Sequence, residues 1–482
     1  MKPQTHPWRH PRPTRLAISL LVLAGLVACS TEPSQPPAQA WTAERLNLPA
    51  SASTPIAANW WQSWGDARLQ GLIAQALREH PGMAQAQARV QRMQALAGIT
   101  DAARLPQAEL SAEQVRQRYS KHGILPTPFA GHIWSNNTLQ VGLGWTPDLW
   151  GEQRNALAAA LGQARAAEAD AAVAAQLLGT QILRGSIALA RLLAQSEASA
   201  QLIQVRAQSQ TLVSQRRAAG LDTRIEQAQS DATLAELQTQ HAALQEQVAL
   251  TRHQLAALCG LAPQALTDYA PRLSDFALAP LPASVGADLL GRRPDVVAAR
   301  WRAEAAQGQV QVARTQFYPS VHLGLFAGYN ALGTEHLLEA GSRQYGVVPA
   351  LRLPLFEGGR LRAQLTGREA ERDLAVAQYN QAVLDAVREA ADALHSEQAA
   401  AQQRQAQAQA LDSSALAHTL AQQREQAGLG NRLAVLGAQA TLIAQQRAAT
   451  DLLARQLDVR VQLMKALGGG WSADASTQTA SR

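Results

Sequence analysis

The chain has 482 residues, of which only 4% are aromatic, and its formal net charge is +6. Four of those six positive units lie in the first 28 residues, so the remainder is nearly neutral at +2. No basic run with interleaved aromatics follows, which argues against nucleic acid as a partner. Alanine, glutamine, leucine and arginine dominate long stretches such as residues 398–411, and these residue types favour closely packed helices.

The N-terminus predicts secretion followed by lipidation. A basic stretch precedes the apolar run 16–24, which is too short to span a membrane and is typical of a signal peptide. The next residues, Leu26-Val27-Ala28-Cys29, resemble the bacterial lipobox, which implies that Cys29 receives a diacylglycerol and becomes the new N-terminus. Ser30 after Cys29 favours delivery to the outer membrane by the same resemblance. The alternative is an ordinary signal peptide with a chance cysteine.

The segment after Cys29 is rich in proline, serine, threonine and alanine up to residue 55, which indicates an extended tether. The other cysteine is Cys259, and an acylated Cys29 leaves it without a disulfide partner in the chain. We expect Cys259 to be a small apolar helix residue. No cofactor is expected beyond the lipid on Cys29.

The chain contains two copies of one unit. Landmarks with proline or glycine recur about 208 to 213 residues apart, for example Pro81 with Pro294 and Gly220 with Gly428. We predict the following division: signal peptide 1–28, acylated tether 29–65, repeat 1 66–270, linker 271–286, repeat 2 287–470 and C-terminal tail 471–482.

Each copy predicts a pair of strands. Apolar residues alternate with small or polar ones over 139–145 and 321–329, and weaker partner strands are expected over 107–118 and 345–353. Such segments of about ten residues fit a membrane barrel, and aromatic residues gather at their ends. Alternation alone does not distinguish a membrane barrel from the half-buried sheet of a soluble protein.

Each copy also predicts a very long helix, a glycine break and a second helix. Residues 151–218 contain no proline and would form a helix about 100 Å long, and 357–427 are similar. The helices after Gly220 and Gly428 carry apolar residues at heptad spacing, which is typical of coiled coils.

Four strands cannot close a barrel, and an open sheet edge cannot face lipid. After the signal peptide we find no apolar run of 18 residues, which argues against helical membrane spans. A chain that crosses the membrane must therefore oligomerise, and three copies would supply twelve strands.

The order of elements and five short motifs resemble the TolC-like outer-membrane efflux factors, specifically the NodT-type lipoprotein branch. The motifs run from the start of the mature body to the second long helix: Trp60-Trp61-Gln62-Ser63-Trp64-Gly65-Asp66, Asp148-Leu149-Trp150-Gly151, Gly291-Arg292-Arg293-Pro294-Asp295-Val296, Gln316-Phe317-Tyr318-Pro319 and Leu353-Pro354-Leu355-Phe356-Glu357-Gly358-Gly359-Arg360. Residues 119–129 look like the branch that serves exporters of aromatic acids, fusaric acid or dyes.

The resemblance implies an α+β membrane protein without enzymatic activity. Its fold would be a homotrimer with a twelve-stranded outer-membrane β-barrel, four strands per chain, continued by a periplasmic α-helical barrel of coiled-coil hairpins. It would be lipid-anchored in the outer membrane and export drugs or other small toxic compounds from the periplasm. The inner tips, at Gly220, Leu221, Gly428 and Leu429, would dock onto a periplasmic adaptor joined to an inner-membrane pump.

The expected gate departs from the family. Members typically close the duct with two acidic residues after the second tip glycine, but those positions are Ala434 and Gly437 here. We expect Asp222 and Glu226, paired with Arg424 or Arg432, to hold the closed state. The alternative is that all four are solvated helix-end residues.

Other classes fit the sequence less well. The histidines of the mature chain are scattered, and no metal-ligand spacing, phosphate-binding loop or nucleophile elbow is present. A periplasmic adaptor lipoprotein is the stronger alternative, but adaptors have one helical hairpin and this chain predicts two. A purely structural coiled coil would explain the helices and leave the four strands unexplained.

Overall fold

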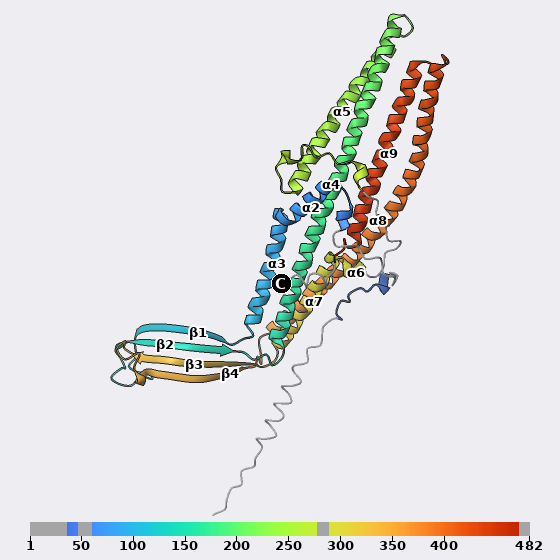
Figure 1. Ribbon diagram of the computed structural model, residues 1–482. Coiled ribbons are helices and arrows are strands. Elements are labelled where there is room, and N and C mark those ends of the chain that lie inside the picture. The colour runs from blue at the N-terminus through green and yellow to red at the C-terminus, as the bar shows by residue number, and fades with distance from the viewer. Residues whose placement is uncertain (1–35, 47–59, 277–288, 472–482) are drawn as a thin grey trace, which may run out of the picture. The chain divides into compact units, whose positions relative to one another are not determined.

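A computed structural model describes residues 36–46, 60–276 and 289–471 (Figure 1). These residues form two compact units. The sheet unit is built from Ala97–Ala159 and Ala305–Leu374, and the helical unit lies within Ala40–Leu96, Ala160–Glu304 and Ala375–Arg482. Cys29 and the predicted signal peptide lie outside the described residues.

The same order of elements occurs twice, as the repeated landmarks predict. The first copy comprises α2 (Ala67–Glu79), α3 (Pro81–Ala102), β1 (Gln107–Arg118), β2 (Ile133–Trp145), α4 (Glu152–Ala218) and α5 (Arg224–Leu258). The second comprises α6 (Leu289–Arg292), α7 (Pro294–Thr315), β3 (Ser320–Leu332), β4 (Arg343–Arg352), α8 (Arg360–Gln426) and α9 (Arg432–Ala466). Corresponding long helices match in length, because α4 and α8 each have 67 residues and α5 and α9 each have 35.

The four strands form one antiparallel sheet in the order β1-β2-β3-β4 (Figure 1). The central pair joins the two copies, with Leu139 opposite Tyr329 and Trp145 opposite Leu323. All four predicted strands are therefore confirmed, with β2 beginning six residues earlier than the alternation indicates.

The pairing register gives the sheet two different faces. The apolar face includes Leu110, Leu139, Val141, Leu143, Trp145, Val321, Leu323, Leu325, Ala327, Tyr329, Tyr345, Val347, Pro349 and Leu351, and at the hairpin end it continues into Arg116, Arg118 and Arg343. The glycine-rich face is the set Glu109, Ser111, Glu113, Gln140, Gly142, Gly144, His322, Gly324, Phe326, Gly328, Asn330, Gln344, Gly346, Val348 and Ala350. Several large side chains of the apolar face stay exposed, including Leu110 at 72% and Tyr345 at 85%. Exposed apolar patches of this kind mark a surface that meets protein or membrane.

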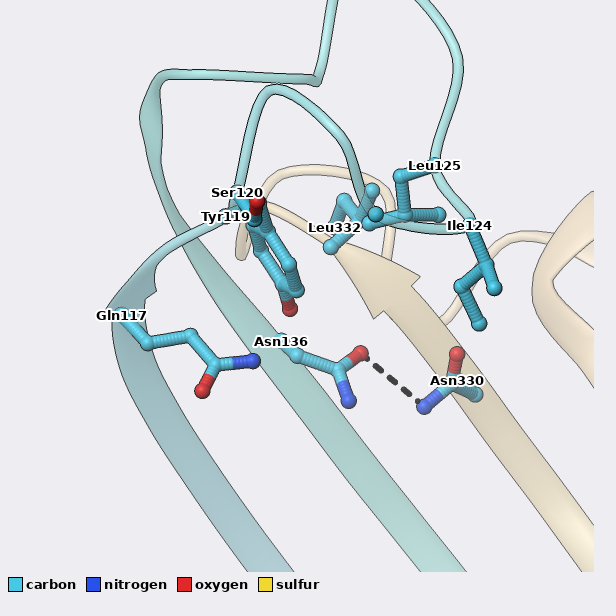
Figure 2. Close-up of a pocket in the computed structure, with 9 residues that line it drawn as sticks. Gln117, Tyr119, Ser120, Ile124, Leu125, Asn136, Asn330 and Leu332 are labelled. Carbon is cyan, nitrogen blue, oxygen red and sulfur yellow. Dashed lines mark hydrogen bonds between the residues drawn. The ribbon is translucent and has the colours of Figure 1, made fainter.

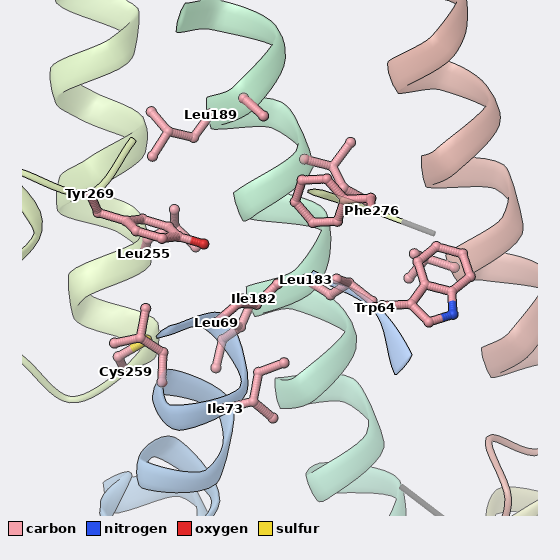
Figure 3. Close-up of a cluster of buried hydrophobic side chains, with 14 of the residues drawn as sticks. Trp64, Leu69, Ile73, Ile182, Leu183, Leu189, Leu255, Cys259, Tyr269 and Phe276 are labelled. Atoms are coloured by element: carbon pink, nitrogen blue, oxygen red, sulfur yellow. The ribbon is translucent and has the colours of Figure 1, made fainter. Parts of the chain in front are cut away.

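The main core lies in the helical unit (Figure 3). Side chains of α2 and the segment before it, α4, α5, α9 and the segment after α5 pack together there, including Trp64, Ile182, Leu183 and Leu255. Cys259 ends α5 inside this core and is 1% exposed, so its expected role as a small apolar residue is confirmed. Burial raises the pKa of its thiol to about 11, which keeps it protonated and unreactive at neutral pH.

The two predicted heptad seams differ in burial. In α9 the apolar positions Leu436, Ala440, Ile443 and Leu457 are all buried. In α5 only Val248, Leu255 and Ala256 are buried, near the C-terminal end of the helix. The seam positions Leu234, Leu237 and Leu244 are only half-buried, so this part of the α5 seam is partly covered within the described chain.

One described helix, α4, is long and apolar enough by length and composition to cross a membrane. No uninterrupted apolar run marks this stretch in the sequence, because α4 mixes leucine and alanine with scattered polar residues. More than half of the stretch in question, 56%, is buried, and Ile182, Leu183 and Ile187 belong to the main core. The apolar composition of α4 is therefore explained by its position in the core of the helical unit.

Candidate functional site

The candidate site consists of the two helix-to-helix turns, named here tip 1 (residues 216–226) and tip 2 (residues 424–434). In tip 1, Gly220 has a φ of 76° after the end of α4. The amide of Leu221 donates to the Arg216 carbonyl at 2.9 Å, and that of Gly220 to the Arg217 carbonyl at 3.0 Å. These two bonds define a Schellman motif, which satisfies the last helical carbonyls and needs a left-handed residue.

Tip 2 repeats this geometry 208 residues later. Gly428 has a φ of 71°, and the Leu429 amide donates to the Arg424 carbonyl at 2.8 Å. Leu221 and Leu429 follow the two glycines and are 67% and 72% exposed. The four predicted docking residues therefore lie at equivalent helix turns, each turn presenting an exposed leucine.

The helix that leaves each tip begins with a side-chain cap. At tip 1 the Thr223 hydroxyl accepts from the Ile225 amide at 3.1 Å, and the Glu226 carboxylate accepts from the Thr223 amide at 2.7 Å. This reciprocal arrangement is a capping box. At tip 2 the Asn431 side chain accepts from the Ala434 amide at 2.8 Å. Glu226 thus has a local structural role that the sequence analysis missed, although the Thr-x-x-Glu signature is present.

The remaining charged candidates also find partners nearby. Arg216 holds Asp222 through two bonds of 2.9 Å, which lowers the pKa of the Asp222 carboxyl. Arg432 lies 3.4 Å from Glu425, and Arg424 donates to the Leu429 carbonyl at 3.5 Å. Among the described residues no ion pair joins tip 1 to tip 2. The expected pairing of Asp222 or Glu226 with Arg424 or Arg432 is absent within this chain, and such pairing between copies stays a prediction.

Packing also holds tip 2 in place. Leu436 and Ala440 near the start of α9 pack with Val205 of α4, and all three are buried. Further along, α9 is joined to α4 by ion pairs between Arg184 and Asp458 at 2.5 Å and between Arg191 and Asp451 at 3.2 Å. The two pairs are seven residues apart on each helix, so they follow the heptad repeat of an antiparallel helix pair.

A buried ion cluster explains part of the Gly291–Val296 motif. The Arg293 side chain is buried and donates to Asp295 at 2.6 Å, to Glu389 at 3.0 Å and to the Ala466 carbonyl at 3.3 Å. It therefore ties the start of α7 to α8 and to the end of α9. We name these groups the Arg293 clamp. No local pattern indicates the contact between Arg293 and Glu389, because the two residues lie 96 positions apart in the chain.

Aromatic residues cluster where the strands of the sheet unit join its helices. The rings of Trp150 and Tyr318 stack with their centroids 5.2 Å apart, and the Trp150 Nε1 atom donates to the Pro319 carbonyl at 2.6 Å. Trp145 donates to the Arg104 carbonyl at 3.1 Å. Within the described parts of the chain, no group of three or more His, Cys, Asp or Glu side chains is placed to hold a metal ion.

Comparison with known proteins gives consistent matches. Residues 72–261 and 285–469 match the sequence profile of the family described as Outer membrane efflux protein. The multidrug resistance outer membrane protein MdtP of Shigella flexneri is 32% identical over 453 residues, which is 91% of either chain. The fusaric acid resistance protein FusA of Burkholderia cepacia is 38% identical over 320 residues, covering 65% of this chain and 60% of FusA.

The fold also matches a solved structure. The crystal structure of the outer membrane protein VceC from Vibrio cholerae superposes with a TM-score of 0.78 at 37% sequence identity. The match covers 86% of this chain and 99% of VceC.

Proposed function

Because the chain belongs to the outer membrane efflux protein family, we propose that it is the exit duct of a tripartite efflux system. It lies in the outer membrane and passes drugs or other small toxic compounds from the periplasm to the exterior. MdtP and VceC are described as outer membrane proteins and FusA as a fusaric acid resistance protein, and none of these descriptions names an enzyme or a periplasmic adaptor. The chain has two helical hairpins, each with its own strand pair, whereas an adaptor has one hairpin. This difference argues against the adaptor alternative.

The observation that carries this function is the asymmetry of the sheet. Its apolar face is exposed and carries charged residues only at the hairpin end, namely Arg116, Arg118 and Arg343, whereas the glycine-rich face carries Glu109, Glu113 and His322. A membrane barrel needs an apolar outer surface and a polar lumen. The stacked Trp150 and Tyr318 fit the aromatic belt at a membrane boundary.

The oligomer we propose is a homotrimer. The outer strands β1 and β4 leave backbone groups unpaired at both edges of the sheet, and such edges are not tolerated in lipid. Three copies would close a twelve-stranded barrel. The partly uncovered seam of α5 supports the same conclusion for the helices, since a second copy could cover it.

The partners we propose are a periplasmic adaptor and, through it, an inner-membrane pump. The two tips would point into the periplasm, and Leu221, Ile225 and Leu429 would offer exposed apolar contacts to the adaptor. A lipid on Cys29 would anchor the mature chain in the outer membrane. The similarity to FusA supports fusaric acid or related aromatic acids as exported compounds.

A pair of neighbouring substitutions on β3 tests the barrel. Leu325→Arg places a charge on the apolar face and should weaken membrane insertion by about 2–4 kcal/mol at mid-bilayer. Gly324→Arg points into the lumen, where a new side chain would meet only Val348 at ordinary contact distance, so it should insert normally and reduce conductance. Outer-membrane fractionation measures insertion, and electrophoresis with and without heating shows whether the inserted chains form heat-sensitive trimers. Equal insertion defects for both variants would contradict the assigned faces.

A further inference from the structure

A cavity of about 550 Å³ lies at the hairpin end of the sheet, under the loop that connects β1 to β2 (Figure 2). Its floor is formed by side chains of the glycine-rich face and its roof by residues of the loop, 119–132. No charged side chain lines it.

The floor consists of three carboxamides from three strands. Figure 2 shows Gln117, Asn136 and Asn330 below the loop residues. Asn330 donates to the Asn136 side chain at 3.1 Å and to the Thr138 hydroxyl at 2.9 Å, so these two amides are fixed. The Gln117 amide has no hydrogen-bond partner among the described residues. It is free to donate to and accept from a bound molecule.

The roof is an ordered loop. The Tyr119 amide donates to the His132 carbonyl at 3.0 Å and the Gly131 amide donates to the Tyr119 carbonyl at 3.0 Å, which extends the β1–β2 ladder into the loop. The rings of Phe129 and Trp134 meet edge to face at 5.4 Å. These contacts hold Tyr119 over the amide floor, and Leu125 and the exposed Ile124 line the cavity further along the loop.

The lining determines which molecules the cavity would accept. Amides, a tyrosine and a serine hydroxyl supply hydrogen bonds of both kinds, while Ile124, Leu125 and Leu332 supply apolar contact. A charged solute would lose hydration here without gaining a counter-charge, which is costly. The volume falls in the range of pockets for drug-sized ligands.

We propose that this cavity is a transit site at the exit mouth for uncharged, amphiphilic small molecules that carry amide, hydroxyl or carbonyl groups; charged cargo, such as an aromatic carboxylate, would pass the mouth without binding here. The proposal rests on the proposed function, because only a closed barrel makes the glycine-rich face the wall of a duct. Three copies of the chain would place three such sites around the mouth. Binding there must be weak, since a conducting site has to release what it binds.

Equilibrium dialysis of radiolabelled chloramphenicol against the purified full-length trimer tests the site. Chloramphenicol is uncharged and carries an aromatic ring, an amide and two hydroxyls; its succinate ester adds one carboxylate to the same skeleton. The wild type should bind chloramphenicol saturably, and the ester should compete poorly. Asn330→Leu and Gln117→Leu should each weaken binding by about fivefold, the equivalent of one hydrogen bond.

Gln114→Leu is the matched control, because Gln114 lies on β1 facing away from the cavity. It should bind like the wild type. Asn330→Leu removes two hydrogen bonds and could disturb the fold. Gln117→Leu tests the cavity without this risk, because the Gln117 side chain makes no hydrogen bond among the described residues. The proposal is overturned if the wild type shows no saturable binding, if both cavity variants bind normally, or if the ester competes as well as chloramphenicol.

Ion conductance of the same trimers in planar bilayers separates this proposal from the proposed function. Conducting trimers without saturable binding would overturn the transit site alone. Trimers that do not conduct at all would overturn the exit duct itself.

Discussion

Single glycines determine how each hairpin turns. Gly220 and Gly428 both have a positive φ, and a Cβ atom at either position would meet no other atom within 4 Å. The requirement for glycine is therefore conformational and owes nothing to crowding. A left-handed residue lets the Schellman bonds form, and these bonds aim Leu221 and Leu429 outward.

Gly428→Val should disturb tip 2 because a β-branched residue resists the left-handed conformation, at a cost of about 1–2 kcal/mol. We expect weaker cross-linking to the adaptor and reduced drug resistance, with trimers unchanged. Gly367→Val is the control, since Gly367 lies inside α8 away from both tips, with open space around it and no positive φ. Normal resistance and normal cross-linking in Gly428→Val would argue against docking at this tip.

Two readings of Glu226 can be separated by substitution. Glutamine preserves a capping box and removes the charge, whereas alanine removes both. If the cap is what matters, Glu226→Ala should raise conductance in planar bilayers by loosening the tip, and Glu226→Gln should conduct like the wild type. Equal increases in both variants would instead support a charged gate. The fixed hydrogen bonds from Thr223 lower the pKa of Glu226, so the carboxylate is ionised at neutral pH.

The gate position of the second copy can be tested by adding the missing acid. Gly437→Asp should introduce block by divalent cations from the periplasmic side, because three copies would place three carboxylates around one aperture. Space for the side chain is available, since a Cβ atom at Gly437 meets nothing within 4 Å. Unchanged conductance in the presence of millimolar divalent cations would place residue 437 away from the aperture.

At the scale of elements, the Arg293 clamp joins three helices of the second copy. Arg293→Met leaves the partly exposed carboxylates of Asp295 and Glu389 without their partner, and a hydrogen bond to a charged group typically contributes about 1.5–3 kcal/mol. The melting temperature of the purified trimer should fall clearly. Arg388→Met is the control, because Arg388 is exposed and its surface pairs with Asp385 and Asp392 contribute little. Similar melting of both variants would contradict a stabilising clamp.

The stability that the Arg293 clamp contributes should also depend on pH. Burial raises the pKa of Asp295, but the hydrogen bonds and charge of Arg293 outweigh it, so the net pKa is lower than the ordinary value of 3.8. A depressed carboxyl pKa contributes stability above the unfolded value and loses it as the pH falls through the folded value. The difference in melting temperature between wild type and Asp295→Asn should therefore be constant near neutral pH and shrink below about pH 4.

At the scale of the whole molecule, membrane attachment involves both the barrel and the proposed lipid. Cys29→Ser should abolish labelling with palmitate and processing by the lipoprotein signal peptidase, because serine lacks the thiol that receives the lipid. Trimers should still insert if the barrel provides the main anchor. Palmitate incorporation into the variant would refute Cys29 as the lipidation site.

Local signals in the sequence were sufficient to predict the helices, the strands and the two tips. Alternation marked β1 to β4, long stretches without proline marked α4 and α8, and paired glycines marked both tips, because each signal acts over a few residues. The capping box at Thr223 and Glu226 was equally readable, since its donor and acceptor lie three residues apart. Burial of Cys259 agrees with the expectation that it is a small apolar residue.

The tertiary structure decided what depends on residues far apart in the chain. The pairing of β2 with β3 crosses the whole first helical hairpin, and the Arg293 clamp joins residues of three helices. The partners of Asp222 and Arg432 were settled by which groups the tips bring within reach, namely Arg216 and Glu425. The sequence by itself thus determined the elements, their order and the family, because propensity and periodicity are local. Register, ion-pair partners and the exit-mouth cavity required the fold, because a Coulomb or hydrogen-bond contact depends on distance in space and leaves no fixed spacing in sequence.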